Sequence, residues 1–236
     1  MGVIDSFLER YSKEVDFFHE AARLCAQRCE TELEQSGIRA IVTFRAKRPE
    51  RLRDKVIARN QEKNYRRVKQ IYDDIVDMSG VRIALYFPGD ANDVEGMIEK
   101  IFDVDQKKLF PRDSSSPPYN KRFSGYAARH YRIRMRPSEL PVSSARYSDA
   151  SIEIQVASVL IHAWAEVEHD LVYKPMSGQL SDEEYAILDE LNGLVLAGEI
   201  ALERLQHAGE ARLLSTEGHF ANHYELAAYI YGRFTN

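Results

Sequence analysis

Residues 152–174 constrain the fold more than any other stretch, because their pattern changes from that of a strand to that of a helix. Apolar and polar residues alternate from 152 to 156, and helical spacing of apolar residues follows from residue 159 onward. A strand with this alternation places Glu153 and Gln155 together on its polar face. The junction either forms a site for a charged ligand or carries solvated charges on an ordinary strand and helix.

The rest of the chain predicts helices that alternate with short strands, without an internal repeat. This order indicates an α/β or α+β fold, and we predict the α+β form, a mixed β-sheet flanked by helices with further helices at both ends. Residues 103–123 contain a Ser-Ser-Ser-Pro-Pro centre and are expected to be irregular. Helices are expected at 5–36, 50–62, 65–78 and 91–102, and strands at 38–44, 81–87, 130–135 and 152–156.

The C-terminal third has a different pattern. Ser181 and Glu184 form a capping box, which predicts the start of a helix. Apolar residues from Leu188 to Leu205 then follow spacings of three and four. Such a seam either packs on the body of the protein or pairs two chains into a homo-oligomer, and we favour packing within the chain. A last helix is expected within residues 215–236.

The composition fits a globular chain. The 236 residues suit one large domain or a domain with a helical appendage. No run approaches the ~20 apolar residues of a membrane span, and the first residues lack a secretory apolar stretch, so we expect a cytoplasmic protein without a membrane partner. Gly2 and Ser6 fit the bare myristoylation pattern, which we interpret as coincidence because no basic cluster lies beside them. Cys25 and Cys29 are expected to pack in the core.

The net charge of −5 hides a local excess of positive charge. Residues 45–69 contain eleven Lys and Arg residues and three acids, so the remainder of the chain is strongly acidic. A basic segment within an acidic protein indicates a focused anion site rather than a general nucleic-acid surface. The alternative is a solvated basic face of a helix.

Two carboxylates and several cations fall near the predicted ends of strands and helices. Asp77 is expected at the end of a helix, and Glu153 lies on a strand. Carboxylates from separate elements can hold Mg²⁺, while Lys and Arg neutralise and orient phosphates. Known Gly-rich phosphate-binding motifs are missing from the sequence, so these residues indicate a magnesium-dependent nucleotide site of another kind. The cations are Arg45, Lys47, Lys55 and Arg82.

These residues belong to motifs that follow one another in the order Arg45-x-Lys47, Asp77-x-x-Gly80-x-Arg82, Gly125-Tyr126-x-x-x-His130, Glu153-Ile154-Gln155 and Trp164-Ala165-Glu166-x-Glu168-His169. The set resembles the synthetase domain of the RelA/SpoT family, the (p)ppGpp alarmone synthetases, which move pyrophosphate from ATP to the 3′-hydroxyl of GDP or GTP. The resemblance runs from about residue 40 to 175. It implies a nucleotidyltransferase-like synthetase fold.

The resemblance also implies how the chain is divided. A helical segment would occupy residues 1–38, the synthetase domain 39–176, and a second helical segment 177–236. The flanking segments are too short for the hydrolase and regulatory regions of the long enzymes, so a synthetase with one catalytic domain is expected.

For the ATP donor, the resemblance implies four binding residues. Arg45 and Arg82 would stack on the two faces of the adenine, a use suited to planar guanidinium groups. Lys47 and Lys55 would hold the phosphates. The alternative for Arg82 is a solvated charge at a strand edge.

For the reaction and the acceptor, the resemblance implies further roles. Asp77 and Glu153 would be the catalytic carboxylates and would ligate Mg²⁺, the implied cofactor. Glu153 would also accept the proton of the acceptor's 3′-hydroxyl. The acceptor nucleotide would be bound by Lys121, Arg122, Tyr126, His130 and Gln155, with Tyr126 stacked on its base.

Departures from the family pattern leave the acceptor open. Arg51 stands where the family's basic motif usually carries Ser, and Ala128-Arg129 stands where Ser-Leu or Ser-Ile is usual. Both changes are expected close to the nucleotide phosphates or the acceptor base. The acceptor is therefore GDP or GTP, an adenine nucleotide that would give a ppApp-like product, or the tRNA 3′ end used by toxic relatives. A non-catalytic nucleotide sensor or oligomeric scaffold is the alternative outside the enzymes, and the two carboxylates argue against it.

Overall fold

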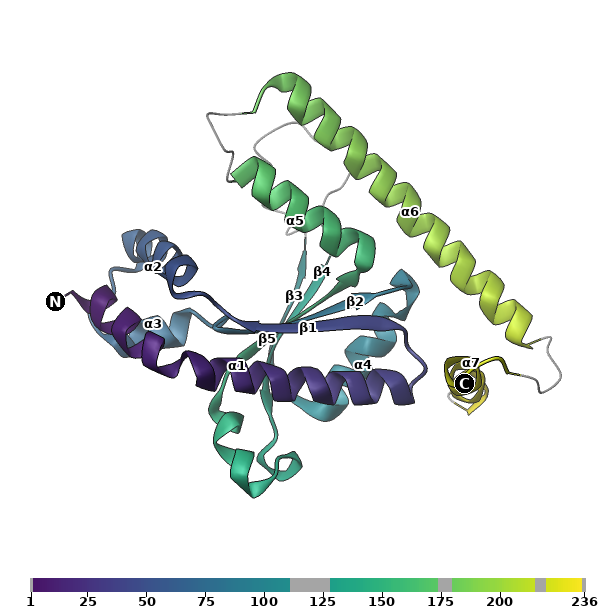
Figure 1. Cartoon of the computed structure of the whole chain (residues 1–236), viewed down its shortest axis with the longest axis horizontal. Coiled ribbons are helices and arrows are strands. Elements are labelled where there is room, and N and C mark those ends of the chain that lie inside the picture. Colours follow the sequence, from purple (N-terminus) through teal and green to yellow (C-terminus); the bar gives the residue numbers. More distant parts are fainter. Residues whose placement is uncertain (1, 111–127, 174–179, 215–219, 235–236) are drawn as a thin grey trace.

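The structure is a computed structural model that describes residues 2–110, 128–173, 180–214 and 220–234. A long helix opens the chain beneath a central sheet, and a second long helix crosses above it (Figure 1). In chain order the elements are α1 (Val3–Gln35), β1 (Ala40–Ala46), α2 (Pro49–Lys63), α3 (Val68–Asp74), β2 (Ser79–Leu85), η1 (Pro88–Asp90), α4 (Ala91–Ile101), β3 (Phe102–Phe110), β4 (Ala128–Met135), η2 (Pro137–Glu139), η3 (Val142–Asp149), β5 (Ile152–Ser158), α5 (Val159–Tyr173), α6 (Asp182–Leu214) and α7 (His223–Phe234).

The five strands form one mixed sheet in the order β1-β2-β5-β4-β3. Strands β2 and β5 are parallel, and the other neighbouring pairs are antiparallel. Helices α1 and α4 lie against one face of the sheet, and α5 lies over the other face (Figure 1). The prediction of an α+β fold with a mixed sheet flanked by helices is confirmed.

The face of the sheet toward α1 and α4 is apolar. The side chains of Val81, Ile83 and Ile154 lie on this face and are at most 1% exposed. They belong to one core cluster that also contains apolar residues of both helices. Burial of each such side chain stabilises the fold by about 1.5–3 kcal/mol. Cys25 and Cys29 are buried, unpaired thiols in the same cluster, as the sequence predicted.

The opposite face of the sheet is polar, because the same alternation points the intervening residues away from this core. Residues paired across neighbouring strands share a face. Arg82 of β2 pairs with Gln155 of β5, and Gly80 pairs with Glu153. His130 of β4 pairs with Gln155 from the other side. The predicted placement of Glu153 and Gln155 on one polar face is confirmed.

The segment expected to be irregular from residue 103 begins with strand β3, so that prediction was wrong for residues 103–110. This strand is at the edge of the sheet, and most of its side chains are exposed. A register shift between Val104 and Gln106 also breaks the period of two. Charged residues are typical of exposed edge strands, and here they hid the strand pattern. Residues 111–127 lie outside the described part of the chain.

The helix expected at 65–78 is much shorter, because α3 ends at Asp74. Ile75 is extended, with φ −91° and ψ 96°. Ile75 and Met78 are nevertheless buried, in a cluster with apolar residues of α1. Their apolar spacing therefore reflects burial of an extended connection and not a helical face. Asp77 lies in this connection between α3 and β2, and its predicted position at a helix end was wrong.

Helix α6 begins with the predicted capping box. The Ser181 N–H donates to Glu184 Oε2 at 2.7 Å, and the Glu184 N–H donates to Ser181 Oγ at 3.3 Å. Further along, α6 packs closely on α5 at Gly198, where a Cβ would lie 2.7 Å from Leu160 Cδ1. The close approach to α5 holds α6 over the polar side of the sheet.

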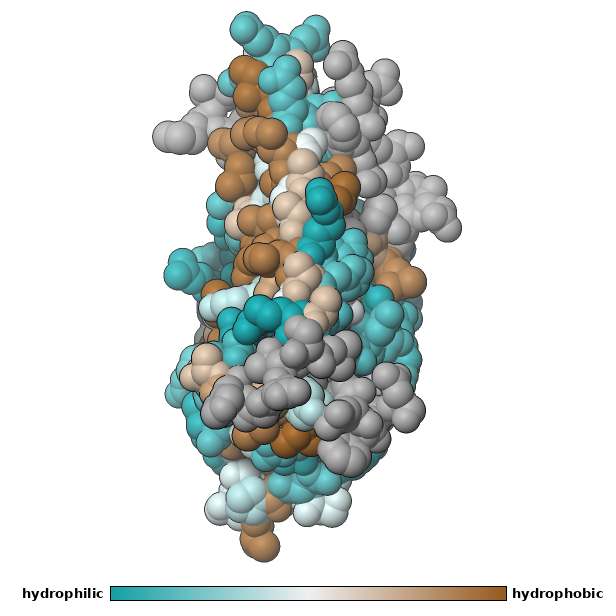
Figure 2. All heavy atoms as spheres, turned by 90° about the vertical axis from the view of Figure 1, so that its right-hand side faces the viewer, coloured by the Kyte–Doolittle hydropathy of each residue, from teal (hydrophilic) through white to brown (hydrophobic). Residues whose placement is uncertain are grey.

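The apolar seam of α6 is only partly covered. Leu188 is buried, and Val195 packs against a small cluster that includes Ile161 of α5, whereas Leu205 is 60% exposed. Hydrophobic side chains gather on the outer surface over α6 (Figure 2). Packing within the chain therefore accounts for part of the seam. In the described part of the chain, neither this helix nor any other is long and apolar enough to span a membrane.

Candidate active site

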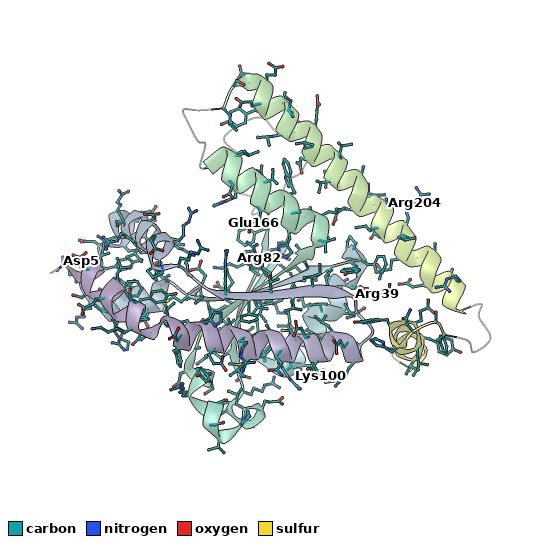
Figure 3. All side chains as sticks on the ribbon, viewed as in Figure 1. Asp5, Arg39, Arg82, Lys100, Glu166 and Arg204 are labelled. Carbon is teal, nitrogen blue, oxygen red and sulfur yellow. The ribbon has the colours of Figure 1, made fainter. Side chains whose placement is uncertain are left out.

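The candidate site lies on the polar face of the sheet and on two connections beside it. Its residues come from the end of β1, from α2, from the α3–β2 connection, and from β2, β4, β5 and α5. Arg82 and Glu166 point toward one another between the sheet and α5 (Figure 3). The fold thus gathers side chains that are separated by more than one hundred positions in the sequence.

Asp77 is bonded to two lysines. Lys47 Nζ and Lys55 Nζ both donate to Asp77 Oδ2, and the Lys55 bond is 2.6 Å long. The backbone fixes this arrangement, because the Lys47 N–H donates to the Met78 carbonyl at 2.9 Å. The Tyr11 hydroxyl of α1 donates to the Lys47 carbonyl at 2.6 Å. One carboxylate thus faces two cations, which leaves a net positive charge.

The charges of this cluster influence one another. Burial alone would raise the pKa of Asp77, but the charges of Lys47 and Lys55 outweigh it, and the pKa is lowered. Burial lowers the pKa of Lys47 despite the attraction of Asp77, and Lys55 lowers it further. Asp77 is therefore ionised at neutral pH. Its Oδ1 atom is buried and has no hydrogen-bond partner among the described residues, so this oxygen can accept a ligand.

Glu153 is held by its neighbours on the polar face. Gln155 Nε2 donates to Glu153 Oε2 at 2.9 Å, and His130 Nδ1 lies 3.5 Å from Glu153 Oε1. Burial would raise the pKa of Glu153, but the hydrogen bonds from His130 and Gln155 lower it, against a small opposing effect of the Asp77 charge. Glu153 is therefore also ionised at neutral pH, and it lies within electrostatic range of Asp77.

The two predicted arginines lie on the same polar face. Arg82 donates from Nε to Gln155 Oε1 at 3.4 Å and forms an ion pair with Glu166 of α5. Arg45 pairs with Gly80 across β1 and β2. On β1 it lies two positions from the residue that pairs with Arg82, so the two arginines share a face. The side chain of Arg45 is exposed. The structure therefore brings Arg45, Arg82, Lys47, Lys55, Asp77, Glu153, His130 and Gln155 to one side of the sheet.

Three predicted acceptor residues, Lys121, Arg122 and Tyr126, lie outside the described residues. The expectation that Arg129 lies near the nucleotide was wrong. Its guanidinium bonds to Glu95 at 2.7 Å on α4, on the apolar side of the sheet. The reason is the strand period, since Arg129 is adjacent to His130 and must point to the opposite face.

One residue of the site, Arg132, was not predicted from the sequence. Arg132 pairs with Glu153 across β4 and β5, so it shares the polar face. Its spacing of two from His130 was a signal, but the strand register that brings it opposite Glu153 depends on the tertiary fold. Glu166 was recognised in its motif without a role, and its ion pair with Arg82 was not predicted.

The donors present fit a hard divalent cation that keeps part of its shell for water and phosphate. Among the described residues no cluster of three or more His, Cys, Asp or Glu side chains has the arrangement of a complete protein-bound metal site. Mg²⁺ usually takes only one or two carboxylates and completes its shell with water and substrate phosphates. Asp77, with its unbonded Oδ1, and Glu153 are the carboxylates that meet this need.

The fold and the site together define an α+β protein whose mixed sheet carries two carboxylates beside lysines and arginines on its polar side. The chain belongs to the RelA/SpoT family, because residues 44–177 match the family model described as the region found in RelA / SpoT proteins. The resemblance that the motifs indicated is thereby confirmed.

Solved structures of a GTP pyrophosphokinase family protein and of a small alarmone synthetase share the fold. A GTP pyrophosphokinase family protein from Streptococcus pneumoniae aligns with a TM-score of 0.65 at 18% identity, over 88% of this chain and 98% of that one. The small alarmone synthetase 1 of Bacillus subtilis aligns with a TM-score of 0.63 at 18% identity, over 86% and 99%. The same synthetase bound to its product pppGpp aligns with a TM-score of 0.60 at 18% identity, over 86% and 99%. No curated protein sequence matches the chain. At this identity the likeness establishes the fold.

Proposed function

We propose that the chain is an ATP-dependent nucleotide pyrophosphokinase, which transfers pyrophosphate from ATP to the 3′-hydroxyl of GDP or GTP, or of an adenine nucleotide, to make an alarmone. The observation that carries the proposal is the pair of ionised carboxylates, Asp77 beside two lysines and Glu153 across the sheet. Family membership supports it, as does the Bacillus synthetase whose structure holds its product pppGpp.

The donor half of the site is the part built from β1, β2 and α2. Lys47 and Lys55 share one carboxylate, so they retain a net positive charge for the phosphates of ATP. Arg45 and Arg82 lie on the same face of neighbouring strands, a placement suited to two guanidinium groups on either side of a base. Arg82 leaves its ion pair with Glu166 when it stacks on adenine.

Asp77 and Glu153 are the proposed ligands of Mg²⁺. When bound, the ion neutralises the charge that builds up on the phosphates during transfer. Asp77 contributes Oδ1, the oxygen that the lysines leave unbonded. The two lysines hold Asp77 ionised and fix its orientation, so this oxygen is in place before substrates bind.

The reaction forms one bond and breaks one. The acceptor's 3′-oxygen bonds to the β-phosphorus of ATP, the bond from that phosphorus to the α,β-bridging oxygen breaks, and AMP leaves. The hydroxyl proton passes to the Glu153 carboxylate, which is ionised because His130 and Gln155 stabilise the charged form. The lysines and arginines stabilise the developing charge on the transferred group.

The acceptor half is built from β4, β5 and the segment before β4. His130 and Gln155 already hold Glu153, so an acceptor bound against them has its 3′-hydroxyl near the Glu153 carboxylate, which accepts the proton. Lys121, Arg122 and Tyr126 are proposed to complete this half by binding the acceptor's phosphates and base.

A thin-layer assay with γ-labelled ATP and Mg²⁺ tests the proposal, with GDP, GTP, ADP, ATP and tRNA offered separately. Label on a nucleotide acceptor supports the proposed activity and identifies the base. Label on tRNA alone assigns the chain to the tRNA-modifying relatives. No transfer to any acceptor by folded protein would refute an enzymatic role and favour a nucleotide sensor.

A further inference from the structure

Arg132 lies in the middle of the polar face. It pairs with Glu153 in the antiparallel register of β4 and β5, and the next pair along these strands is His130 with Gln155. Paired residues of an antiparallel ladder have Cβ atoms about 4.5–5.5 Å apart and project to the same side. Arg132 therefore stands beside the proposed catalytic carboxylate.

The Arg132 side chain has no partner in the described part of the chain. Its Nε atom is buried without a hydrogen bond, and no ion pair joins it to a described carboxylate. The neighbouring arginines of the same strand differ in this respect. Arg129 bonds to Glu95 at 2.7 Å, and Arg134 bonds to Asp105 at 2.7 Å. A partly buried guanidinium left unpaired is costly unless a ligand satisfies it, and guanidinium matches phosphate in geometry and charge.

The order of the strands indicates whether Arg132 faces the phosphates of the donor or those of the acceptor. The donor residues Arg45, Lys47 and Arg82 belong to β1, its end and β2, at one side of the sheet. Strand β5 with Glu153 lies in the middle, and β4 with Arg132 lies beyond it. Arg132 is thus separated from the donor cations by the catalytic carboxylate, on the half that His130 shares.

We propose that Arg132 binds a phosphate on the 5′ side of the acceptor's ribose and so makes the enzyme select phosphorylated acceptors over bare nucleosides. This inference rests on the proposed function and extends it to a residue outside the family motifs. A free nucleoside diphosphate and an RNA 3′ end both carry a phosphate at this position. The contact therefore selects for the phosphate and is indifferent to the base.

Binding measurements on the full chain test the proposal, with the donor site filled by a non-hydrolysable ATP analogue and Mg²⁺. The probes are GDP and ADP, each compared with its nucleoside, and a short RNA that ends in adenosine. Arg132→Gln is expected to weaken binding of the phosphorylated probe that the wild type accepts by about 10- to 100-fold, as for loss of a charged hydrogen bond. Nucleoside binding is expected to stay unchanged. The probe that loses affinity identifies the source of the phosphate.

Arg134→Gln is the matched control, since it removes the same group from the same strand at an exposed ion pair. It is expected to leave all probes unaffected. Arg132→Lys is expected to bind with intermediate affinity, and it keeps the test available if the Gln variant does not fold. In the transfer assay the Gln variant should raise KM for the acceptor and leave KM for ATP unchanged.

Three results for Arg132→Gln would overturn the assignment. They are an equal loss of affinity for nucleotide and nucleoside, no loss of affinity for either, or a rise in KM for ATP alone. The first two deny a phosphate contact, and the third moves the residue to the donor half. Because binding is measured without turnover, a wild type that transfers nothing refutes the proposed function separately. The phosphate-dependent difference between wild type and Arg132→Gln is judged by affinity alone.

Discussion

Replacing Asp77 with Asn removes the charge that holds the lysine cluster together. Lys47 Nζ and Lys55 Nζ both donate to the same Asp77 oxygen. An Asn keeps the size of the side chain but leaves two neighbouring cations without their counter-ion. Lys55 already opposes the charged form of Lys47 in the native protein, so the repulsion between them becomes uncompensated. We expect the variant to be less stable and inactive.

The size of the loss of stability follows from the two hydrogen bonds that Asp77 accepts. A hydrogen bond to a charged group contributes about 1.5–3 kcal/mol to stability. The Lys55 side chain is 35% exposed and the Lys47 side chain 24%, so water recovers part of this energy. We expect a decrease of about 2–3 kcal/mol in the free energy of unfolding. For a chain of this length, each kcal/mol lowers Tm by about 2–4 °C, which gives a decrease of about 4–12 °C.

The dependence on pH identifies the cause. The pKa of Asp77 in the folded state lies below its usual value of 3.8. Its stabilising effect is therefore complete above that value and is lost as pH falls through the lower, folded-state pKa. Urea unfolding at several pH values should show the largest difference in free energy of unfolding between wild type and Asp77→Asn at neutral pH. Below pH 3.8 this difference in free energy of unfolding should become smaller.

The control is Asp73→Asn, which removes an exposed carboxylate from α3, close to Asp77 in the sequence. It should change Tm little. If Asp77→Asn unfolds at the same temperature as Asp73→Asn, the lysine cluster does not depend on this carboxylate, and the reasoning is refuted.

Three further predictions follow from the same geometry. Glu153→Gln should abolish transfer while nucleotide affinity, measured by calorimetry, stays near that of the wild type; normal turnover would remove its metal and base roles. Ser181→Ala should lower stability by about 1 kcal/mol through loss of the cap with Glu184, seen as faster hydrogen exchange in the first turn of α6; unchanged exchange would contradict it. Burial raises the pKa of Asp90 to about 6, although the bond from Gln206 lowers it, so the folded state binds this proton more tightly and stability should rise as pH falls from about 6 toward 3.8. Asp90→Asn should flatten that rise, and an unchanged profile in urea unfolding would disprove the assignment.

Local sequence patterns predicted the parts of the fold that alternate regularly. The strand with Glu153 and Gln155 has one face in the core and one in the site, so its period of two is clear. Strand β3 was missed because it lies at the edge of the sheet with most side chains exposed, and a register shift interrupts its pattern. Ile75 and Met78 imitated a helix because an extended connection is buried against α1.

The candidate site was predicted from motifs more fully than the fold was from periodicity. The motifs named Asp77 and its two lysines, although they are separated by up to 30 positions. They did not name Arg132, because its place opposite Glu153 is set by the pairing of β4 with β5. Strand pairing is a property of the tertiary fold, and a single sequence does not encode it locally.

The measurement that tests the central claim most directly is a ³¹P NMR time course of the wild type with ATP, Mg²⁺ and the acceptor chosen by the labelled assay. Pyrophosphate transfer predicts one AMP for every acceptor consumed, together with a new pair of coupled diphosphate signals attached to the 3′-oxygen. Formation of ADP with a single new phosphate on the acceptor would show phosphoryl transfer instead and would contradict the account.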